Sequence, residues 1–386
     1  MATTRTQVAI IGAGPAGLLL GQMLQRSGID ATVIESRSRA HVEERIRAGV
    51  LEQGTADTLR EWGVGERMDR QGLVHHGIEL RFEGVGHRID LSGLTGGKHV
   101  TVYGQHEVVR DLIAARVAPL VFEVADTAVH DIATEHPYVT YTQDGVAHRL
   151  DAEIIAGCDG FHGICRAAVP DARFFDRSYP FAWLGILAEA PPPTEELIYA
   201  RHERGFALSS MRSPTLSRLY LQCRPDEDLG AWSDARIWEE LHLRLGTDLT
   251  PGPVLQKGVT AMRSFVTEPM RHGRLFLAGD AAHIVPPTGA KGMNLAVADI
   301  RVLFRALEAF FRNGDQRLME GYSATCLKRI WKAQRFSWWM TSMLHRFDDD
   351  DAFEHRVQVA ELDYVCSSRA AMTTLAENYV GLPLDV

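Results

Sequence analysis

The chain has 386 residues, of which 45% are apolar and 24% are charged, and this ordinary composition excludes disordered and fibrous proteins. Its length suffices for two domains that share an interface. The formal net charge of −9 gives no reason to expect a nucleic-acid partner, and no apolar run approaches the ~18 residues of a membrane helix. The five cysteines are scattered without metal-ligand spacing, so the sequence predicts a cytoplasmic protein without a metal site.

The first element is an apolar strand over residues 8–11, followed by a glycine-rich turn, a helix and a second strand that ends at Glu35. Three glycines occupy the turn in G-x-G-x-x-G spacing: Gly12, Gly14 and Gly17. The first permits a tight turn, the second lets a diphosphate approach the backbone, and the third packs the helix on the strand. Because an acid after the second strand accepts ribose hydroxyls, this unit predicts a dinucleotide site; the alternative is a turn that binds nothing.

Arg45 and Arg47 come next, before a helix predicted over 50–62. They are consistent either with a solvated turn or with an anion-binding pair. Alternating polarity from 72 to 89 indicates an excursion into strands at about 73–98, and a helix is predicted over 107–116. A strand over 152–155 then leads to Asp159, a carboxylate at the sheet edge where α/β proteins bind their ligands.

A hairpin follows the proline-rich connector at 190–194. By the period of two, Ser210 and Arg212 share one face of the first strand with two apolar residues, and Tyr220 lies on one face of the return strand. Arg212 therefore either reaches solvent at the end of the sheet or meets an anion beside an apolar pocket.

The strand–acid–helix arrangement recurs near the C-terminus, where a buried strand over 274–278 leads to Asp280. A helix predicted over 291–312 then offers its positive N-terminal end to the ligand of that acid. A further helix over 328–347 is rich in aromatic residues, which at helical spacing indicate core packing rather than a cofactor site.

Together these motifs resemble the class A flavoprotein aromatic hydroxylases, and the resemblance extends over nearly the whole chain. The segments 45–53, 156–163, 275–292 and 377–383 and the Arg212/Tyr220 hairpin are similar to those of the 4-hydroxybenzoate 3-monooxygenase family in particular. The resemblance implies an α/β fold with a Rossmann-like FAD-binding domain, a β-sheet substrate domain and a helical C-terminal part. It places the FAD-binding domain at 1–175, with the strand excursion at 73–98 and completion by 263–345. The substrate domain covers 176–262, and a C-terminal interface segment covers 346–386.

The resemblance also implies FAD as cofactor and NADH or NADPH as co-substrate. The residues expected to hold FAD are Gly12, Gly14, Gly17, Glu35, Arg45, Arg47, Gln105, Asp159, Asp280, Gly289, Gly292 and Asn294. The residues expected to serve NAD(P)H are Arg37, Arg39, Arg45, Arg47, His162 and Arg263.

For the substrate, the family's carboxylate clamp corresponds to Ser210, Arg212 and Tyr220. Its catalytic residues correspond to Tyr199, which binds the phenolic oxygen, Tyr379 as relay partner, and His75 at the outer end of a proton path. Backbone contacts to the substrate are expected from Pro287, which also counts among the catalytic residues, and from Thr288.

The implied reaction is hydroxylation of 4-hydroxybenzoate at its 3-position by NAD(P)H and O₂, through a flavin C4a-hydroperoxide, in a homodimer. Hydroxylation of a related benzoate such as 4-aminobenzoate is an alternative, as are a flavin dehydrogenase or reductase and a nucleotide-binding sensor. The two tyrosines argue against the last two, since neither needs a phenol proton path. The coenzyme preference is open, because Ser36 replaces an arginine of NADPH-dependent members, and Glu43 and Glu44 stand where those members are uncharged.

Overall fold

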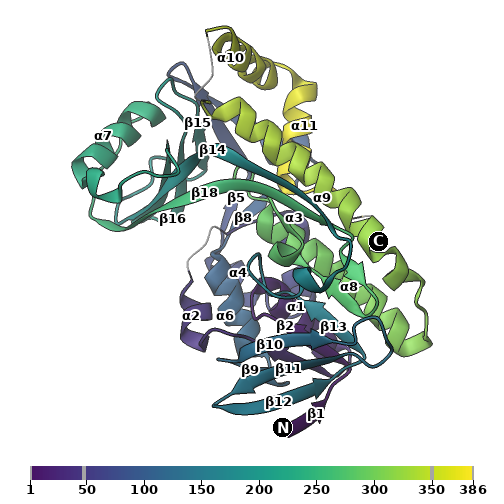
Figure 1. The fold of residues 1–386 in the computed structure, drawn as a ribbon. Helices are drawn as coiled ribbons and strands as arrows, with labels where there is room; N and C mark the ends of the chain where they lie inside the picture. Colours follow the sequence, from purple (N-terminus) through teal and green to yellow (C-terminus); the bar gives the residue numbers. More distant parts are fainter. Residues whose placement is uncertain (1, 46–48, 348–351, 385–386) are drawn as a thin grey trace.

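The computed structural model of the chain describes residues 2–45, 49–347 and 352–384. The lower half of the molecule in Figure 1 is built on a six-stranded sheet, in which five neighbouring strands run parallel. Its spatial order is β19 (Arg271–His272), β20 (Leu275–Leu277), β13 (Ile154–Gly157), β2 (Val8–Ile11), β3 (Ala31–Ile34) and β9 (Leu120–Val121). The central strands read as short, continuous apolar runs because both of their faces are buried.

A second, four-stranded sheet lies below the first in Figure 1. It contains β1 (Ala2–Arg5), β12 (Val146–Asp151), β11 (Tyr138–Gln143) and β10 (Ala125–His130). A small three-stranded sheet contains β4 (Val50–Leu51), β8 (Val100–Val102) and β5 (Leu73–His75).

The upper half contains an eight-stranded sheet whose two longest strands arch from the upper half toward the lower one (Figure 1). Its order is β21 (His283–Ile284), β18 (Val254–Glu268), β14 (Arg173–Ala188), β17 (Leu216–Cys223), β16 (Ala207–Ser213), β15 (Leu197–Ala200), β6 (Gly77–Phe82) and β7 (Val85–Asp90). Two strands of the 73–98 excursion, β6 and β7, thus join the substrate-side sheet, where β6 pairs in parallel with β15, while β5 pairs with β8 in the small sheet.

Helices cover these sheets and join the two halves. They are α1 (Pro15–Arg26), α2 (Arg39–Glu44), α3 (Gln53–Glu61), α4 (Glu66–Gln71), α5 (Leu91–Leu94), α6 (Gln105–Ala115), α7 (Asp234–Leu245), α8 (Gly292–Asn313), α9 (Arg317–Leu344), α10 (Ala352–Ser367) and α11 (Arg369–Val380), with short 3₁₀ turns η1 (Arg166–Ala168), η2 (Leu229–Ala231) and η3 (Gly279–Ala281). In Figure 1 the long α9 runs along one side of the molecule, past both halves. One apolar core surrounds the parallel sheet, and a second lies between the eight-stranded sheet and α9 to α11.

Two predicted helices differ from the observed ones by more than two residues at one end or both. The helix predicted over 50–62 is wrong at its start, because Val50 and Leu51 pair with β8 as a strand before α3 begins. The aromatic helix predicted over 328–347 is the second half of α9, which starts at Arg317 and ends at Leu344. None of the helices in the described part of the chain has the length and apolar character needed to cross a membrane.

Candidate active site

The glycine-rich turn joins β2 to α1 and leaves room for a ligand at one defined position. A Cβ atom on Gly12, whose φ is +107°, would lie 2.3 Å from the Cys158 carbonyl oxygen, and one on Gly17 would lie 2.0 Å from the Gly12 oxygen. Gly12 and Gly17 are therefore required by the packing of the chain itself. A Cβ on Gly14, the N-cap of α1, meets no atom within 4 Å, so the helix N-terminus faces open space there. This space beside exposed backbone donors fits the diphosphate of FAD.

Glu35 lies directly after β3 and is held by the backbone around it. One carboxylate oxygen accepts a hydrogen bond from the Ala13 N–H at 2.8 Å, and the other accepts from the Arg37 N–H at 2.8 Å. These bonds tie the end of β3 to the glycine turn, so the acid stands beside the proposed diphosphate position.

Two further carboxylates follow neighbouring strands at the same edge of the sheet, Asp159 after β13 and Asp280 after β20. Asp159 accepts from the Cys165 N–H at 2.9 Å, and burial raises the pKa of its carboxyl group. Its other oxygen is buried without a hydrogen-bond partner among the described residues. Asp280 lies in the turn η3, before the segment that leads into α8.

The segment before α8 brings the expected flavin and substrate contacts together. The hydroxyl of Thr288, which follows Pro287, is fully buried and has no partner in the described part of the chain. Gly289 has φ of +86°, and a Cβ on Gly292 would meet nothing within 4 Å. Asn294 makes three backbone bonds: its side-chain oxygen accepts from the Glu52 N–H, and its amide nitrogen donates to the carbonyls of Val50 and Ala290. Asn294 thus fastens α8 to the small sheet.

The clamp residues occupy one face of the eight-stranded sheet. In the β16–β17 register, Leu208 faces Tyr220 and Ser210 faces Arg218, while a β-bulge follows at the position of Arg212. Burial lowers the pKa of Arg212, and the nearby Tyr220 hydroxyl accepts a hydrogen bond from the Arg218 guanidinium at 3.4 Å. One guanidinium nitrogen of Arg212 and the Ser210 hydroxyl are buried without partners among the described residues. A cation with a buried, unpaired nitrogen beside an unpaired hydroxyl is an arrangement that a ligand carboxylate would complete.

The other expected residues at this site are two buried tyrosines whose hydroxyl oxygens lie 2.7 Å apart, Tyr199 and Tyr379. Burial raises the pKa of Tyr199 to about 12 and raises that of Tyr379 well above its ordinary value. Both hydroxyls therefore keep their protons near neutral pH. His75 is also buried, and burial lowers its pKa to about 4. Neither of its ring nitrogens has a hydrogen-bond partner within the described residues, so the structure links the tyrosines to each other but not to His75.

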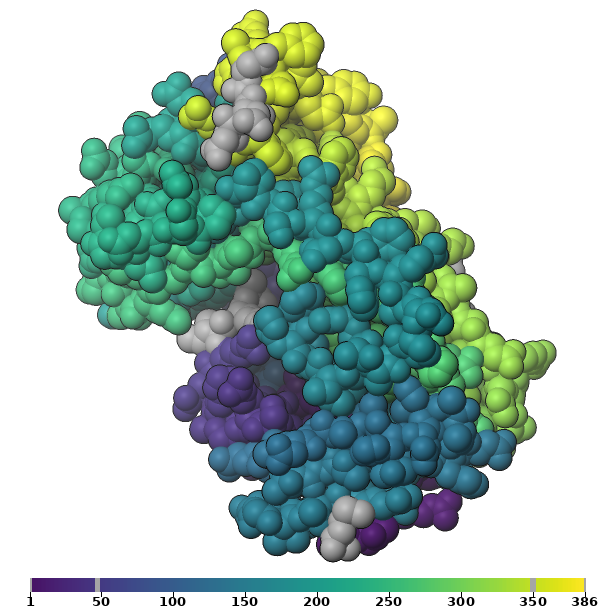
Figure 2. All heavy atoms as spheres, in the orientation of Figure 1, coloured from purple at the N-terminus to yellow at the C-terminus, as the bar shows by residue number. Residues whose placement is uncertain are grey.

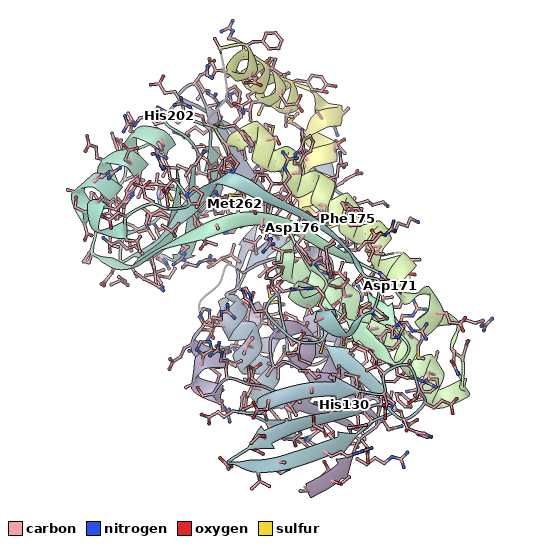
Figure 3. All side chains as sticks on the ribbon, viewed as in Figure 1. His130, Asp171, Phe175, Asp176, His202 and Met262 are labelled. Atoms are coloured by element: carbon pink, nitrogen blue, oxygen red, sulfur yellow. The ribbon has the colours of Figure 1, made fainter. Side chains whose placement is uncertain are left out.

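Two of the residues expected to bind NAD(P)H lie beside the aromatic ring of Phe161. The Arg263 guanidinium lies 4.4 Å from that ring centroid, and His162 packs edge-on against it at 5.1 Å. Arg263 also forms a bidentate ion pair with Asp176, which Figure 3 labels on the arch of β14 and β18. The ion pair raises the pKa of Arg263.

The remaining expected coenzyme and flavin residues lie around α2 and α6. Arg39 pairs with Glu43 at 2.7 Å on the surface of α2, and Arg45 follows that helix. Arg47 lies outside the described residues. Gln105 is the first residue of α6. Figure 2 shows the surface hollowed between the purple atoms of α2 and the green atoms of the eight-stranded sheet.

A family model described as "FAD binding domain" matches residues 5–337. The chain belongs to this family. It is 51% identical over its full length to p-hydroxybenzoate hydroxylase of Acinetobacter baylyi, of which the alignment covers 98%. The FAD-dependent aromatic monooxygenase class inferred from the sequence is thereby confirmed, with NAD(P)H as its reductant.

More distant relatives share the fold. The chain is 25% identical to a probable NADH-specific resorcinol 4-hydroxylase of Rhodococcus jostii, over 82% of this chain and 61% of that protein. Among solved structures, p-nitrophenol 4-monooxygenase of Pseudomonas putida superposes with a TM-score of 0.84 at 19% identity, covering 99% of this chain and all of that one. The Diels-Alderase PyrE3 also superposes, with a TM-score of 0.80 at 20% identity over 98% of this chain and 81% of that one. The fold alone therefore does not determine hydroxylation.

The structure also contains a buried charged cluster that the sequence analysis did not predict. Lys291 donates to Glu52 at 2.6 Å and to the carbonyl of Tyr379 at 3.2 Å, while Arg329 donates to the other Glu52 oxygen at 2.9 Å. Arg329 also donates to the carbonyl of Leu382 at 2.6 Å. The cluster joins α8, α9 and the C-terminal segment beside the tyrosine pair. Its members are far apart in sequence and belong to no motif, so only their contacts in the folded chain reveal them.

Proposed function

We propose that this chain hydroxylates 4-hydroxybenzoate at its 3-position to 3,4-dihydroxybenzoate, using bound FAD, NAD(P)H and O₂. The observation that carries the proposal is that a carboxylate-binding group on β16 lies next to a phenol-binding group on the neighbouring strand β15. Arg212 and Ser210 offer buried, unpartnered donors for a carboxylate, and the Tyr199–Tyr379 pair offers a hydroxyl for a phenol. The 51% identity to p-hydroxybenzoate hydroxylase supports the same substrate.

The residues that we propose for FAD surround the edge of the parallel sheet. Gly14 leaves space for the diphosphate, Glu35 would accept hydrogen bonds from the adenosine ribose, and Asp280 would accept them from the ribityl chain. The first turn of α8, which begins at Gly292, would place its positive end at the flavin ring. When bound and reduced, the flavin supplies the oxygen-activating chemistry. Asp159 serves this site indirectly, since its carboxylate holds the loop at Cys165.

The proposed catalytic role of Tyr199 is to make the substrate phenolate accessible. A phenol has a pKa of about 10, and lowering it by one unit requires about 1.4 kcal/mol of preferential phenolate stabilisation. A hydrogen bond to a charged oxygen contributes about 1.5–3 kcal/mol, or one to two pKa units. Because the pKa of Tyr199 is raised to about 12, its hydroxyl stays protonated and donates to the substrate oxygen, while the Tyr379 hydroxyl donates in turn to the Tyr199 oxygen. Pro287 and Thr288 contact the ring, and His75 forms the outer end of the path.

For the coenzyme, we propose Arg263 and His162 as the phosphate-binding residues, with Arg37, Arg39, Arg45 and Arg47 at the adenosine end. Arg263 keeps its charge beside Phe161, and its partner Asp176 is replaced by a coenzyme phosphate on binding. This exchange needs little energy because both members of the pair are partly exposed.

We also propose the division into an FAD-binding part at 1–175 and 263–345, a substrate part at 176–262 and a C-terminal segment at 346–386. The strands β6 and β7 belong with the substrate part, because they pair within its sheet. A homodimer is supported by large exposed apolar side chains on α9 and α10, namely Trp331, Trp338, Phe353, Val357 and Tyr364. The five free cysteines are consistent with a cytoplasmic enzyme.

The test is substrate-stimulated oxidation of NAD(P)H by the purified, FAD-loaded protein, with the product identified. We expect 3,4-dihydroxybenzoate in near-stoichiometric amount with oxygen consumed. The alternative substrate, 4-aminobenzoate, keeps the carboxylate but lacks the phenol proton, so efficient turnover of it alone would contradict the role of the tyrosines. Reduction of FAD without oxygen insertion into either compound would favour a reductase.

A further inference from the structure

One completely buried histidine lies close to the clamp without belonging to it. His345 is the C-cap of α9, and its Nε2 atom lies 2.7 Å from the indole nitrogen of Trp183 on β14. Its Nδ1 atom lies 3.0 Å from the carbonyl oxygen of Thr341. The indole nitrogen only donates and a carbonyl only accepts, so Nε2 must carry a lone pair and Nδ1 the proton. The two contacts select the same tautomer.

This tautomer is neutral, and its surroundings disfavour protonation of the ring. A proton on Nε2 would face the indole N–H, and the buried ring packs against the aromatic side chains of Phe181, Trp183 and Phe206. Burial accordingly lowers the pKa of His345 to about 3. The Nε2 atom of His345 therefore remains a hydrogen-bond acceptor for the Trp183 indole at any pH where the protein works.

The ring of His345 lies in an aromatic stack that reaches both ends of the proposed substrate site. It stacks on Phe206 with centroids 4.3 Å apart and on Phe181 at 4.7 Å. Phe206 in turn stacks on Trp183 at 5.0 Å and contacts Tyr199 at 6.2 Å. The ring of Trp183 lies 4.9 Å from the ring of Tyr220, a member of the expected clamp. One stack thus touches both the phenol-binding tyrosine and the clamp tyrosine.

We propose that His345 is a positioning residue for hydroxylation, which fixes the indole of Trp183 and thereby the orientation of Tyr220 and Tyr199. This inference rests on the function proposed above. Phenylalanine would fill the same space and preserve the stacking, but only an acceptor at Nε2 gives the indole ring one orientation. Without the acceptor the indole is free to turn its N–H elsewhere. The rings of Phe206 and Tyr220, which pack on the indole, then no longer have one fixed orientation.

A double-mutant cycle on the FAD-loaded protein separates this role from simple packing. His345→Phe keeps a stacking ring but leaves the Trp183 N–H without an acceptor, and Trp183→Phe removes the donor. His345→Gln is the conservative variant, because its amide both accepts and donates. The readouts are the dissociation constant of 4-hydroxybenzoate, the fraction of oxygen recovered as H₂O₂, and the dissociation constant of FAD.

We expect His345→Phe to weaken substrate binding about tenfold and to raise the H₂O₂ fraction, with FAD affinity within twofold of wild type. The Gln variant should recover both readouts, and the double variant should lie closer to wild type than the sum of the single effects. Additive single effects, or substrate affinity and coupling within twofold of wild type in His345→Phe, would overturn the inference. If His345→Phe does not fold, Trp183→Phe decides: unchanged affinity and coupling overturn the inference, and loss of both supports it.

The proposed function is judged separately by wild type and by Arg212→Ala. A wild-type protein that forms no dihydroxybenzoate contradicts the function and the inference together. A coupled wild type with an unaffected His345→Phe variant contradicts the inference alone.

Discussion

The glycine turn and the substrate clamp differ in how far the chain satisfies its own polar groups. At the turn, both oxygens of Glu35 accept backbone hydrogen bonds, and Gly12 and Gly17 are packed against backbone. At the clamp, Ser210 and one nitrogen of Arg212 are buried without partners in the described chain. The Glu35 side chain is satisfied without a ligand, whereas the clamp side chains need a carboxylate to be satisfied. Substitutions at the clamp should therefore act on substrate binding and leave the cofactor site intact.

Replacing Arg212 should give the largest separation between the two regions. Arg212→Ala removes the buried cation, and we expect 4-hydroxybenzoate binding to weaken by about 2–5 kcal/mol, the scale for truncating one member of a buried charge pair. Titration of the FAD-loaded protein with substrate measures the effect. Affinity for FAD should stay unchanged, and Arg5→Ala, an exposed arginine on β1, is the matched control. Substrate affinity within twofold of wild type would place the carboxylate elsewhere.

Tyr199→Phe should separate substrate binding from substrate activation. The clamp remains, so binding should be nearly unchanged, but the phenolate loses a hydrogen bond of about 1.5–3 kcal/mol. The pH-dependent red shift of bound substrate should move up by one to two pH units or vanish, with H₂O₂ as the main product. Tyr379→Phe should slow hydroxylation, because it breaks the 2.7 Å link in the proton path. Tyr141→Phe, in the four-stranded sheet, is the control. Full coupling in Tyr199→Phe would refute its role.

Acid should destabilise the fold through two buried histidines, His75 on β5 and His345 at the end of α9. Burial lowers the pKa of His75 from 6.5 to about 4 and that of His345 to about 3. The unfolded chain therefore binds protons below pH 6.5 that the folded chain does not. Stability is fully present above pH 6.5 and is lost as the pH falls toward 4, by about 1.4 kcal/mol per pH unit for each histidine. Thermal unfolding between pH 7 and 4.5 tests this, and His75→Gln should flatten the profile. An equally steep profile in that variant would contradict the contribution of His75.

The sequence predicts the turn well and the clamp only in part, for a physical reason. Gly12, Gly17 and Glu35 act through contacts within one strand–helix–strand unit, so their spacing carries the whole signal. The period of two in β16 places Arg212 on a face but leaves open whether that face meets solvent or an anion. Only the burial of Arg212 among distant elements decides this. The bond between Trp183 and His345 joins residues 162 positions apart and has no local pattern at all.

The smallest expected effect is on the preference for NADH or NADPH, which depends on charged residues at α2 in the FAD-binding part. A selective site for the 2′-phosphate of NADPH needs free cationic donors, but Arg39 is paired with Glu43 at 2.7 Å on α2. One carboxylate at ~8 Å opposes a unit charge by about 0.5–2 kcal/mol at an effective dielectric of 20–80, which is comparable to what one exposed arginine contributes. We therefore expect both coenzymes to be used, with NADH at least as good as NADPH in steady-state kcat/KM at equal ionic strength. Glu43→Gln should release Arg39 and shift the ratio toward NADPH several-fold, while Glu61→Gln, on α3, should not shift it. A preference of the wild type for NADPH above tenfold would show that Arg37 and Arg39 outweigh the acids of this segment.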